Sequence, residues 1–221
     1  MENTAGPKKK RDGRQHRADG ERSRQAILKA ASELATLEGL AGLSIGRLAD
    51  YVGMSKSGLF AHFKSKEELQ LAAIDTAAET VKREVLDPAW AAAPGLARVY
   101  AFCDAYFSHL DRRVFPGGCF FISVAAEFDG KEGPVREYAM KAYVEVLKDF
   151  RAMIEQAREV GEIDPAEDID QLTFELDSFM LCVNFAMFFF RDPGAIARGR
   201  EAVRQRIARA VPSKAKRAGG Q

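Results

Sequence analysis

Apolar residues recur at helical spacing along most of the chain, and no stretch shows the strict alternation of a β-strand. Glycine and proline separate these runs, for example at Asp87-Pro88, at Pro116-Gly117-Gly118 and at Asp192-Pro193-Gly194. The runs between the breaks span residues 21–39, 43–53, 55–64, 65–86, 94–111, 119–128, 133–160, 168–190 and 194–210. The pattern therefore predicts an all-α protein of about nine helices.

Residues 43–66 carry the most specific local pattern. Ser44 is a natural helix N-cap, Gly53 can take the positive φ of a tight turn, and Ser55 can cap a second helix. The residues expected to face the core stand at helical spacing on both sides of the turn: Ile45, Leu48, Ala49, Val52, Leu59 and Phe63. Two short helices joined by a glycine turn predict a helix-turn-helix over about residues 45–64, whose second helix fits the DNA major groove.

The flanking segments make this motif more specific. An amphipathic helix is expected before it, and Ser65 with Glu68 forms a capping box that starts the next helix. The junction reads Leu-Phe-x-His-Phe-Lys-Ser-Lys-Glu-Glu-Leu. In this order and with this junction, residues 22–82 resemble the DNA-binding domain of the tetracycline-repressor (TetR) family. The resemblance implies an N-terminal three-helix domain that binds double-stranded operator DNA as a homodimer. It also implies a C-terminal helical domain, residues 83–210, for effector binding and dimerisation.

The outward-facing side chains of the second helix are the candidate base readers. Lys56 and Ser57 lie in its first turn, where side chains reach base edges. Phe60 matches a position where the family usually has tyrosine, so only apolar contacts are left there. The resemblance implies DNA contacts by His62 and Lys66, although the helix dipole alone also favours a histidine at a helix C-terminus. The predicted DNA-binding set is Ser44, Arg47, Ser55, Lys56, Ser57, Phe60, His62 and Lys66.

The first helix of the motif is expected to read less of the DNA sequence. Gly46 stands where some relatives carry a base-reading side chain. Arg47 beside it can contact a phosphate, and it can equally be a solvated charge. Ser44 combines two expected roles, because its hydroxyl can both cap the helix and donate to a phosphate.

The charge distribution agrees with this division of the chain. The net charge is only +1, but residues 1–66 carry +6, residues 67–197 carry −12 and residues 198–221 carry +7. A basic module next to an acidic one is expected when only the first neutralises phosphates. Residues 1–20 are predicted to be a disordered basic arm, either a DNA contact or a solvated tail, and residues 211–221 a basic tail.

Polar groups within apolar helices are the clue to an effector site, because small-molecule pockets are mainly apolar with a few orienting polar groups. The predicted effector set is Phe102, Tyr106, His109, Phe121 and Glu127. Asp177 and Asn184 share one face of a later helix and are further polar candidates. A hydrogen bond to neighbouring backbone is the alternative for each polar group. The 15 phenylalanines and 5 tyrosines fit a small apolar or aromatic effector, although a large helical core would also use them.

Residues 168–190 contain more apolar surface than one face of a monomeric bundle needs. The apolar positions are Leu172, Leu176, Phe179, Met180, Val183, Ala186, Met187 and Phe190. Together with the last helix they predict an isologous dimer face, since a two-fold DNA reader needs two half-sites. The alternative is that this helix is the buried centre of the domain. Met180 and Val183 are the positions where a charged replacement is expected to break the dimer.

Other functional classes find less support. No glycine-rich phosphate loop, metal cluster or nucleophile grouping occurs, so neither an enzyme nor a cofactor or metal is expected. Cys119, expected at a helix N-terminus where the pKa of its thiol would be lowered, leaves a thiol-redox regulator as the alternative. Three cysteines at irregular spacing fit a reducing cytoplasm. No secretory signal is evident, and the apolar run 179–190 is too short for a membrane span, so a cytoplasmic protein without membrane contact is expected.

Overall fold

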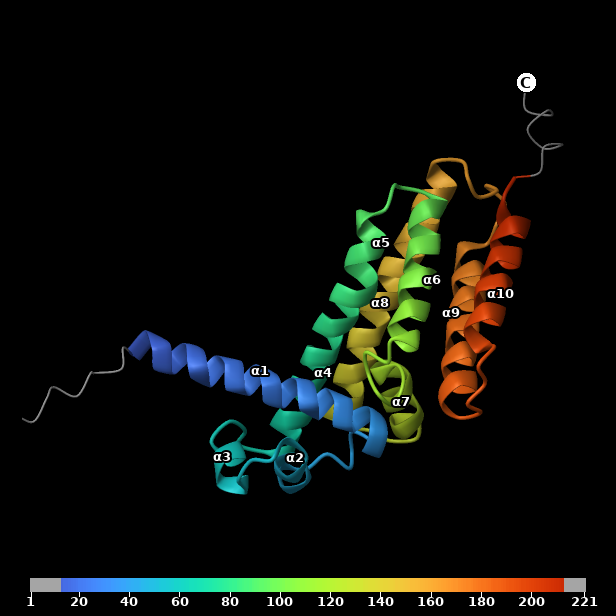
Figure 1. The fold of residues 1–221 in the computed structure, drawn as a ribbon. Coiled ribbons are helices and arrows are strands. Elements are labelled where there is room, and N and C mark those ends of the chain that lie inside the picture. The colour runs from blue at the N-terminus through green and yellow to red at the C-terminus, as the bar shows by residue number, and fades with distance from the viewer. Residues whose placement is uncertain (1–12, 213–221) are drawn as a thin grey trace, which may run out of the picture.

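The structure is a computed structural model that describes residues 13–212. Most of these residues are helical, and no strand occurs within that range (Figure 1). The elements are α1 (Gly13–Glu38), α2 (Ile45–Val52), α3 (Lys56–Phe60), α4 (Lys66–Val81), the π-helical segment η1 (Lys82–Leu86), α5 (Asp87–Ala91), α6 (Leu96–Asp111), α7 (Phe120–Phe128), α8 (Pro134–Glu159), α9 (Ile169–Phe188) and α10 (Ala195–Ala210). With α4, η1 and α5 taken as one continuous helix, the predicted all-α fold of nine helices is confirmed over these residues.

The helices divide into a small and a large group (Figure 1). Helix α1 lies across the lower end of the molecule with α2 and α3 beside it, and α4 runs from this group into the larger bundle of α5, α6 and α8. Helices α9 and α10 form a pair at the far side of the bundle, and α7 lies at its foot, next to the C-terminal end of α1. The core of the small group includes Leu34, Leu48, Leu59, Phe63 and Leu69, all fully buried.

Two predicted boundaries near the N-terminus differ from the structure. Helix α1 begins at Gly13, so the prediction of a disordered arm is wrong for residues 13–20. Arginine, glutamine and alanine are good helix formers, so a helix that continues into a packed region can extend through them. Helix α3 ends at Phe60 rather than near residue 64. Residues 1–12 of the predicted arm, and residues 213–221 of the predicted tail, lie outside the described residues.

The predicted break at Asp87-Pro88 is also wrong, because the helix continues to Ala91. Proline has no N–H and its ring collides with the carbonyl one turn earlier in a regular helix. The wider π-helical turn over Lys82–Leu86 relieves both problems. The backbone N–H of Asp87 donates to the carbonyl of Lys82, five residues earlier, and Pro88 then occupies the first turn of α5, where no N–H partner is needed.

Candidate DNA-binding surface and effector cavity

The turn between α2 and α3 has the geometry that the sequence predicts. Ser44 caps α2 and accepts a hydrogen bond from the N–H of Arg47 at 3.2 Å. Gly53 ends α2 in the left-handed conformation with φ +68°, where a side chain would be strained. Ser55 caps α3 and accepts from the N–H of Gly58 at 3.1 Å. These caps fix the angle at which α3 leaves α2.

Helix α3 presents one face to solvent and one to the core. Leu59 is fully buried, whereas Lys56 and Ser57 are exposed and Phe60 is 59% exposed. The side chain of Lys56 lies over Gly46 of α2, since a Cβ at Gly46 would stand 3.4 Å from the Lys56 Cε atom. The absence of a side chain at Gly46 therefore leaves room for the ammonium group of Lys56.

Three further residues of the predicted DNA-binding set have contacts within the protein. Arg47 forms a bidentate ion pair with Glu38 at the end of α1. The ammonium group of Lys66 donates to the carbonyl of Ala41. His62 follows α3 in a turn instead of ending the helix, and its N–H donates to the carbonyl of Leu59 at 2.9 Å. Arg47 and Lys66 would have to exchange these partners for phosphate to contact DNA.

The connection between α1 and α2 is hydrogen-bonded by side chains of two other helices, α7 and α4. The carboxylate of Glu127 on α7 accepts from the N–H of Leu40 at 2.6 Å and from that of Ala41 at 2.9 Å. From the other side, Gln70 of α4 donates to the carbonyl of Leu40 at 2.7 Å. The placement of Glu127 in the effector pocket is therefore wrong. The sequence shows only that a polar residue stands near the end of this helix. Its hydrogen-bond partner Leu40 lies 87 residues away and is brought close by the packing of α7 on α1.

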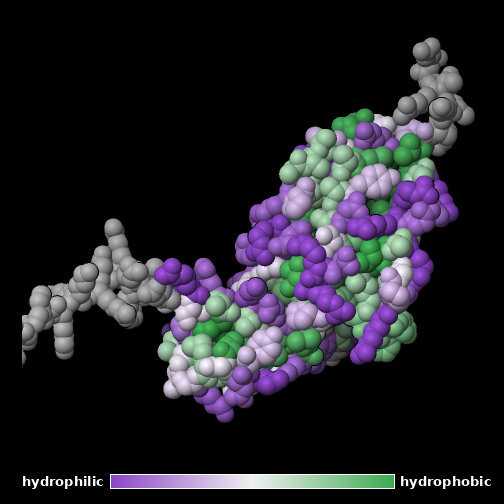
Figure 2. Space-filling view, viewed as in Figure 1, coloured by the Kyte–Doolittle hydropathy of each residue, from purple (hydrophilic) through white to green (hydrophobic). Residues whose placement is uncertain are grey.

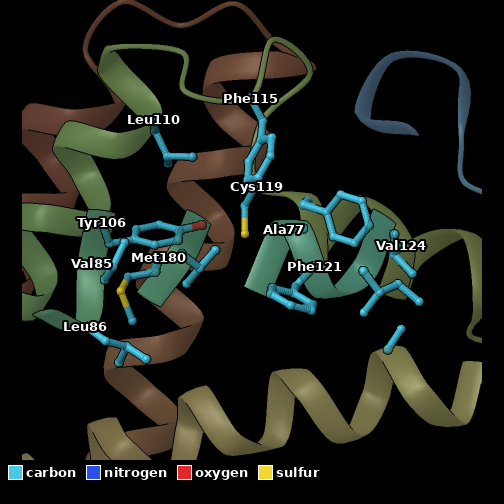
Figure 3. Close-up of a cluster of buried hydrophobic side chains, with 14 of the residues drawn as sticks. Ala77, Val85, Leu86, Tyr106, Leu110, Phe115, Cys119, Phe121, Val124 and Met180 are labelled. Atoms are coloured by element: carbon cyan, nitrogen blue, oxygen red, sulfur yellow. The ribbon is translucent and has the colours of Figure 1, made fainter. Parts of the chain in front are cut away.

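The remaining four residues of the predicted effector set do meet. Phe102, Tyr106 and His109 of α6 and Phe121 of α7 line one internal cavity. Its other walls come from the end of α4, from η1 and from α7, α8 and α9: Val81, Val85, Cys119, Ile122, Tyr143, Val146, Leu147, Asp177 and Met180. Figure 3 shows part of this region, with Tyr106 pointing toward Cys119. The interior is narrow, with about 30 Å³ open to a water-sized sphere.

Two polar side chains in this cavity are buried without ordinary hydrogen bonds. The hydroxyl of Tyr106 has no nitrogen or oxygen partner and interacts only with the thiol of Cys119, and neither ring nitrogen of His109, which is only 1% exposed, has a partner. Burial lowers the pKa of His109 to about 4, because the charged imidazolium is poorly solvated there. The pKa of Tyr106 is raised, again chiefly by burial. Unpaired buried polar groups are costly, which makes these two the natural orienting groups for a ligand.

Asp177 brings a carboxylate to the same cavity. The hydroxyl of Tyr143 on α8 donates to its two oxygens at 3.0 and 3.3 Å. Burial raises the pKa of Asp177, and the hydrogen bond from Tyr143 partly offsets this. Asp177 was predicted from the sequence as a polar candidate for the effector site, because it shares a helix face with Asn184. Tyr143 was missed, because on an amphipathic helix it reads as an ordinary core position.

Cys119 and Asn184 have structural roles. Cys119 precedes the first residue of α7, as predicted, but the expected lowered pKa is wrong: burial raises the pKa of its thiol. The N–H of Cys119 donates to the side-chain oxygen of Asn184 at 2.8 Å. Asn184 thus satisfies backbone at the start of α7. A buried thiol with a raised pKa is a poor nucleophile, so nothing here favours the redox alternative.

The apolar excess of α9 lies on two faces. Met180 and Val183 are buried in their own chain, so their choice as dimer contacts is wrong. The exposed apolar positions are Phe174, Leu181, Phe185, Phe189 and Phe190. The ring centroids of Phe185, Phe189 and Phe190 lie within 5.2 Å of one another. Hydrophobic surface is visible in Figure 2 at the lower end of the α9–α10 pair, where the chain turns from one helix to the other.

Within residues 13–212, no group of three or more histidine, cysteine, aspartate or glutamate side chains is arranged to hold a metal ion. Nor does any helix in that part of the chain combine the length and the apolar character that crossing a bilayer requires. The groups that remain for chemistry are the exposed face of α3 and the polar residues of the cavity.

A helix-turn-helix that exposes lysine and serine, joined to a helical bundle with an internal cavity, defines a DNA-binding regulator with a sensor domain. Residues 27–73 match the family model "Bacterial regulatory proteins, tetR family", and residues 95–203 match "Tetracyclin repressor-like, C-terminal domain". The chain belongs to the TetR family of transcriptional regulators. Members of this family are in general ligand-responsive DNA-binding repressors and typically homodimers.

Solved structures with the same fold include a TetR transcriptional regulator from Chloroflexus aurantiacus J-10-FL. It is 26% identical, with a TM-score of 0.80, and the match covers 88% of this chain and 98% of that one. A TetR-family regulator from Cytophaga hutchinsonii is 21% identical, with a TM-score of 0.75 and coverage of 89% and 98%. AibR, solved in complex with isovaleryl coenzyme A and operator DNA, is 20% identical, with a TM-score of 0.64 and coverage of 86% and 98%. Among curated proteins, none matches significantly.

Proposed function

We propose that this protein is a homodimeric repressor that binds a palindromic operator and leaves it when a small effector, apolar or aromatic in its main body, occupies the cavity. The observation that carries the proposal is the position of α7. Phe121 of this helix forms a wall of the cavity, and Glu127 of the same helix holds the N–H groups of Leu40 and Ala41. A shift of α7 is therefore passed directly to the connection between α1 and α2.

DNA binding is assigned to α3 and its surroundings. Lys56 and Ser57 supply hydrogen-bond donors for base edges, and Phe60 supplies an apolar contact for a thymine methyl group or a sugar. Ser44, Ser55 and His62 lie close to this helix in sequence and are assigned to phosphate contacts. Arg47 and Lys66 can join them by exchanging Glu38 and the Ala41 carbonyl for phosphate oxygens.

Dimerisation is assigned to the exposed aromatic face of α9 together with α10. An exposed cluster of this kind is unfavourable in water and is typical of a surface covered by a partner. A second copy related by a two-fold axis would cover Phe174, Phe185 and Phe189 with the same residues of its own chain. The two α3 helices would then meet half-sites about 34–36 Å apart, and a change in this separation would weaken binding.

Fluorescence anisotropy with duplexes from the gene's own promoter region tests the proposal. A two-fold symmetric site should bind much more tightly than either half-site alone, and a library of small apolar compounds should contain one that releases it. Phe121→Trp narrows the cavity and should alter the response to that compound while leaving operator affinity without effector nearly unchanged. Equal affinity for the promoter and for random duplexes would refute the proposal.

A further inference from the structure

The cavity contains one formal charge. Of the described residues that line it, Asp177 alone carries a carboxylate, and neither lysine nor arginine is among them. No described lysine or arginine forms an ion pair with Asp177, whose side chain accepts only from the hydroxyl of Tyr143. A carboxylate withdrawn from water without a cation is unfavourable, so a ligand that brings a positive charge to Asp177 would be favoured at this position.

The groups around this carboxylate suit a cation with an apolar body. The rings of Phe121 and Tyr143 are stacked, with centroids 5.9 Å apart and planes 20° from parallel. Aromatic faces attract ammonium groups, most strongly where water is excluded. His109 is neutral at pH 7, so one of its ring nitrogens is a free acceptor, and the oxygen of Tyr106 is another. An ammonium group has several N–H donors, and both of these acceptors line the same cavity as Asp177.

We infer that the effector is an organic amine with an aromatic or aliphatic body, bound through its ammonium group to Asp177. The inference rests on the proposed function, because it names the chemical class that the same cavity accepts. An effector whose charged end is a carboxylate or phosphate would place like charge beside Asp177. A neutral effector would leave Asp177 without a cation.

Space for the body of such a ligand lies next to the cavity. A hollow of about 260 Å³ between α7 and α8 shares Phe121 and Tyr143 as walls with the narrow interior. A ligand that displaces the Phe121 ring would be in contact with both spaces. Asp129 and Arg136 line the outer hollow with opposite charges, so selection for charge falls to Asp177. Since Phe121 and Glu127 belong to the same helix, a ligand that displaces α7 as a whole would act on the α1–α2 connection.

Calorimetry on the full-length protein tests the inference with a graded series of phenylalkylamines and with phenylalkanols and phenylalkanoates of the same chain lengths. The best amine should bind at least about tenfold more tightly than its alcohol, and the carboxylates should bind more weakly than either. Asp177→Asn keeps the size of the side chain and an acceptor for Tyr143. It should weaken amine binding by about tenfold or more and leave alcohol binding unchanged.

The matched control is Asp170→Asn, which removes the same charge from the first turn of α9, where Asp170 pairs with Arg151 at the surface. It should leave the ranking of the three series unchanged. Failure of all amines to bind, tighter binding of the alcohol or carboxylate, or unchanged amine affinity in Asp177→Asn would overturn the inference. Operator anisotropy measured in parallel separates the two proposals. Intact operator binding with no amine binding overturns only the cation site, whereas amine binding without operator release overturns only the regulatory mechanism.

Discussion

His109 should make the protein sensitive to mild acid, and the structure gives the size of the effect. The imidazole is 1% exposed and neither nitrogen has a hydrogen-bond partner. Burial lowers its pKa from 6.5 to about 4. As the pH falls, the unfolded chain takes up a proton at this residue before the folded chain does. The stability associated with neutral His109 is therefore fully present above pH 6.5 and is lost as the pH falls toward about 4.

The magnitude follows from the two pKa values. The full shift corresponds to roughly 3 kcal/mol per protomer once the pH is below both values, and to about 2 kcal/mol at about pH 5 relative to about pH 8. Asp177 acts in the opposite direction, because its raised pKa gives stability at low pH that is lost as the pH rises through the folded-state value. The pH profile of the wild type therefore mixes both groups, and only a comparison with variants isolates His109.

Replacement of His109 by phenylalanine removes the titrating group and keeps an aromatic ring against Phe115, whose centroid lies 5.4 Å from that of His109. Urea unfolding followed by circular dichroism, at one protomer concentration, should show the variant gaining about 2 kcal/mol over the wild type between about pH 8 and about pH 5. His109→Gln cannot titrate either and should show the same pH-dependent gain from a lower starting stability. A stability difference that stays constant over this range in both variants would refute the desolvation argument.

Further predictions concern the three other functional parts of the molecule. Lys56→Ala should lower the discrimination between operator and random duplex by about 1–3 kcal/mol, which competition assays measure. Lys66→Ala should lower the affinity for both duplexes by similar factors and reduce the slope of log affinity against log salt concentration by about one unit, which salt titrations measure. Phe185→Glu should give monomers in sedimentation experiments, whereas the same change at exposed Met140 of α8 should not. Glu127→Gln should lower the coupling free energy between effector and operator by about 1–2 kcal/mol, while calorimetry should show no comparable loss of effector affinity. Equal losses in coupling and in effector affinity would contradict the role given to Glu127.

The helix-turn-helix could be predicted closely because its signals are local. Ser44, Gly53, Ser55 and Ser65 act on backbone within a few residues, and each one caps or turns the chain where the sequence places it. The same local reasoning failed at Pro88. A proline normally ends a helix, and only the π-helical turn before it, which depends on packing of the bundle, lets the helix continue.

The cavity was predictable only in part, because its members come from distant helices. Helical periodicity brought together Phe102, Tyr106 and His109, which share one face of α6. In α7, helical periodicity puts Phe121 and Glu127 on different sides of the helix, but it could not show that one side faces the cavity and the other the α1–α2 connection. Periodicity tells whether a residue is buried, whereas the identity of its partner depends on how whole helices pack.

The hydrogen bonds of Glu127 also limit how strongly the effector can act on DNA binding. A ligand shifts the equilibrium only by the difference in its affinity for the two arrangements of the protein. If the arrangement that binds DNA keeps both bonds from Leu40 and Ala41 and the effector-bound arrangement lacks them, these bonds, each worth about 1.5 kcal/mol net, favour the DNA-binding arrangement by about 3 kcal/mol per protomer. This corresponds to roughly a hundredfold change in operator affinity for each half-site. Gln70 still holds the carbonyl of Leu40 from the side of α4, so the connection would be released from the cavity wall while it stays attached to the DNA-binding domain. The contact between α7 and the connection is thus strong enough to account for regulation and weak enough to be reversed by a small ligand.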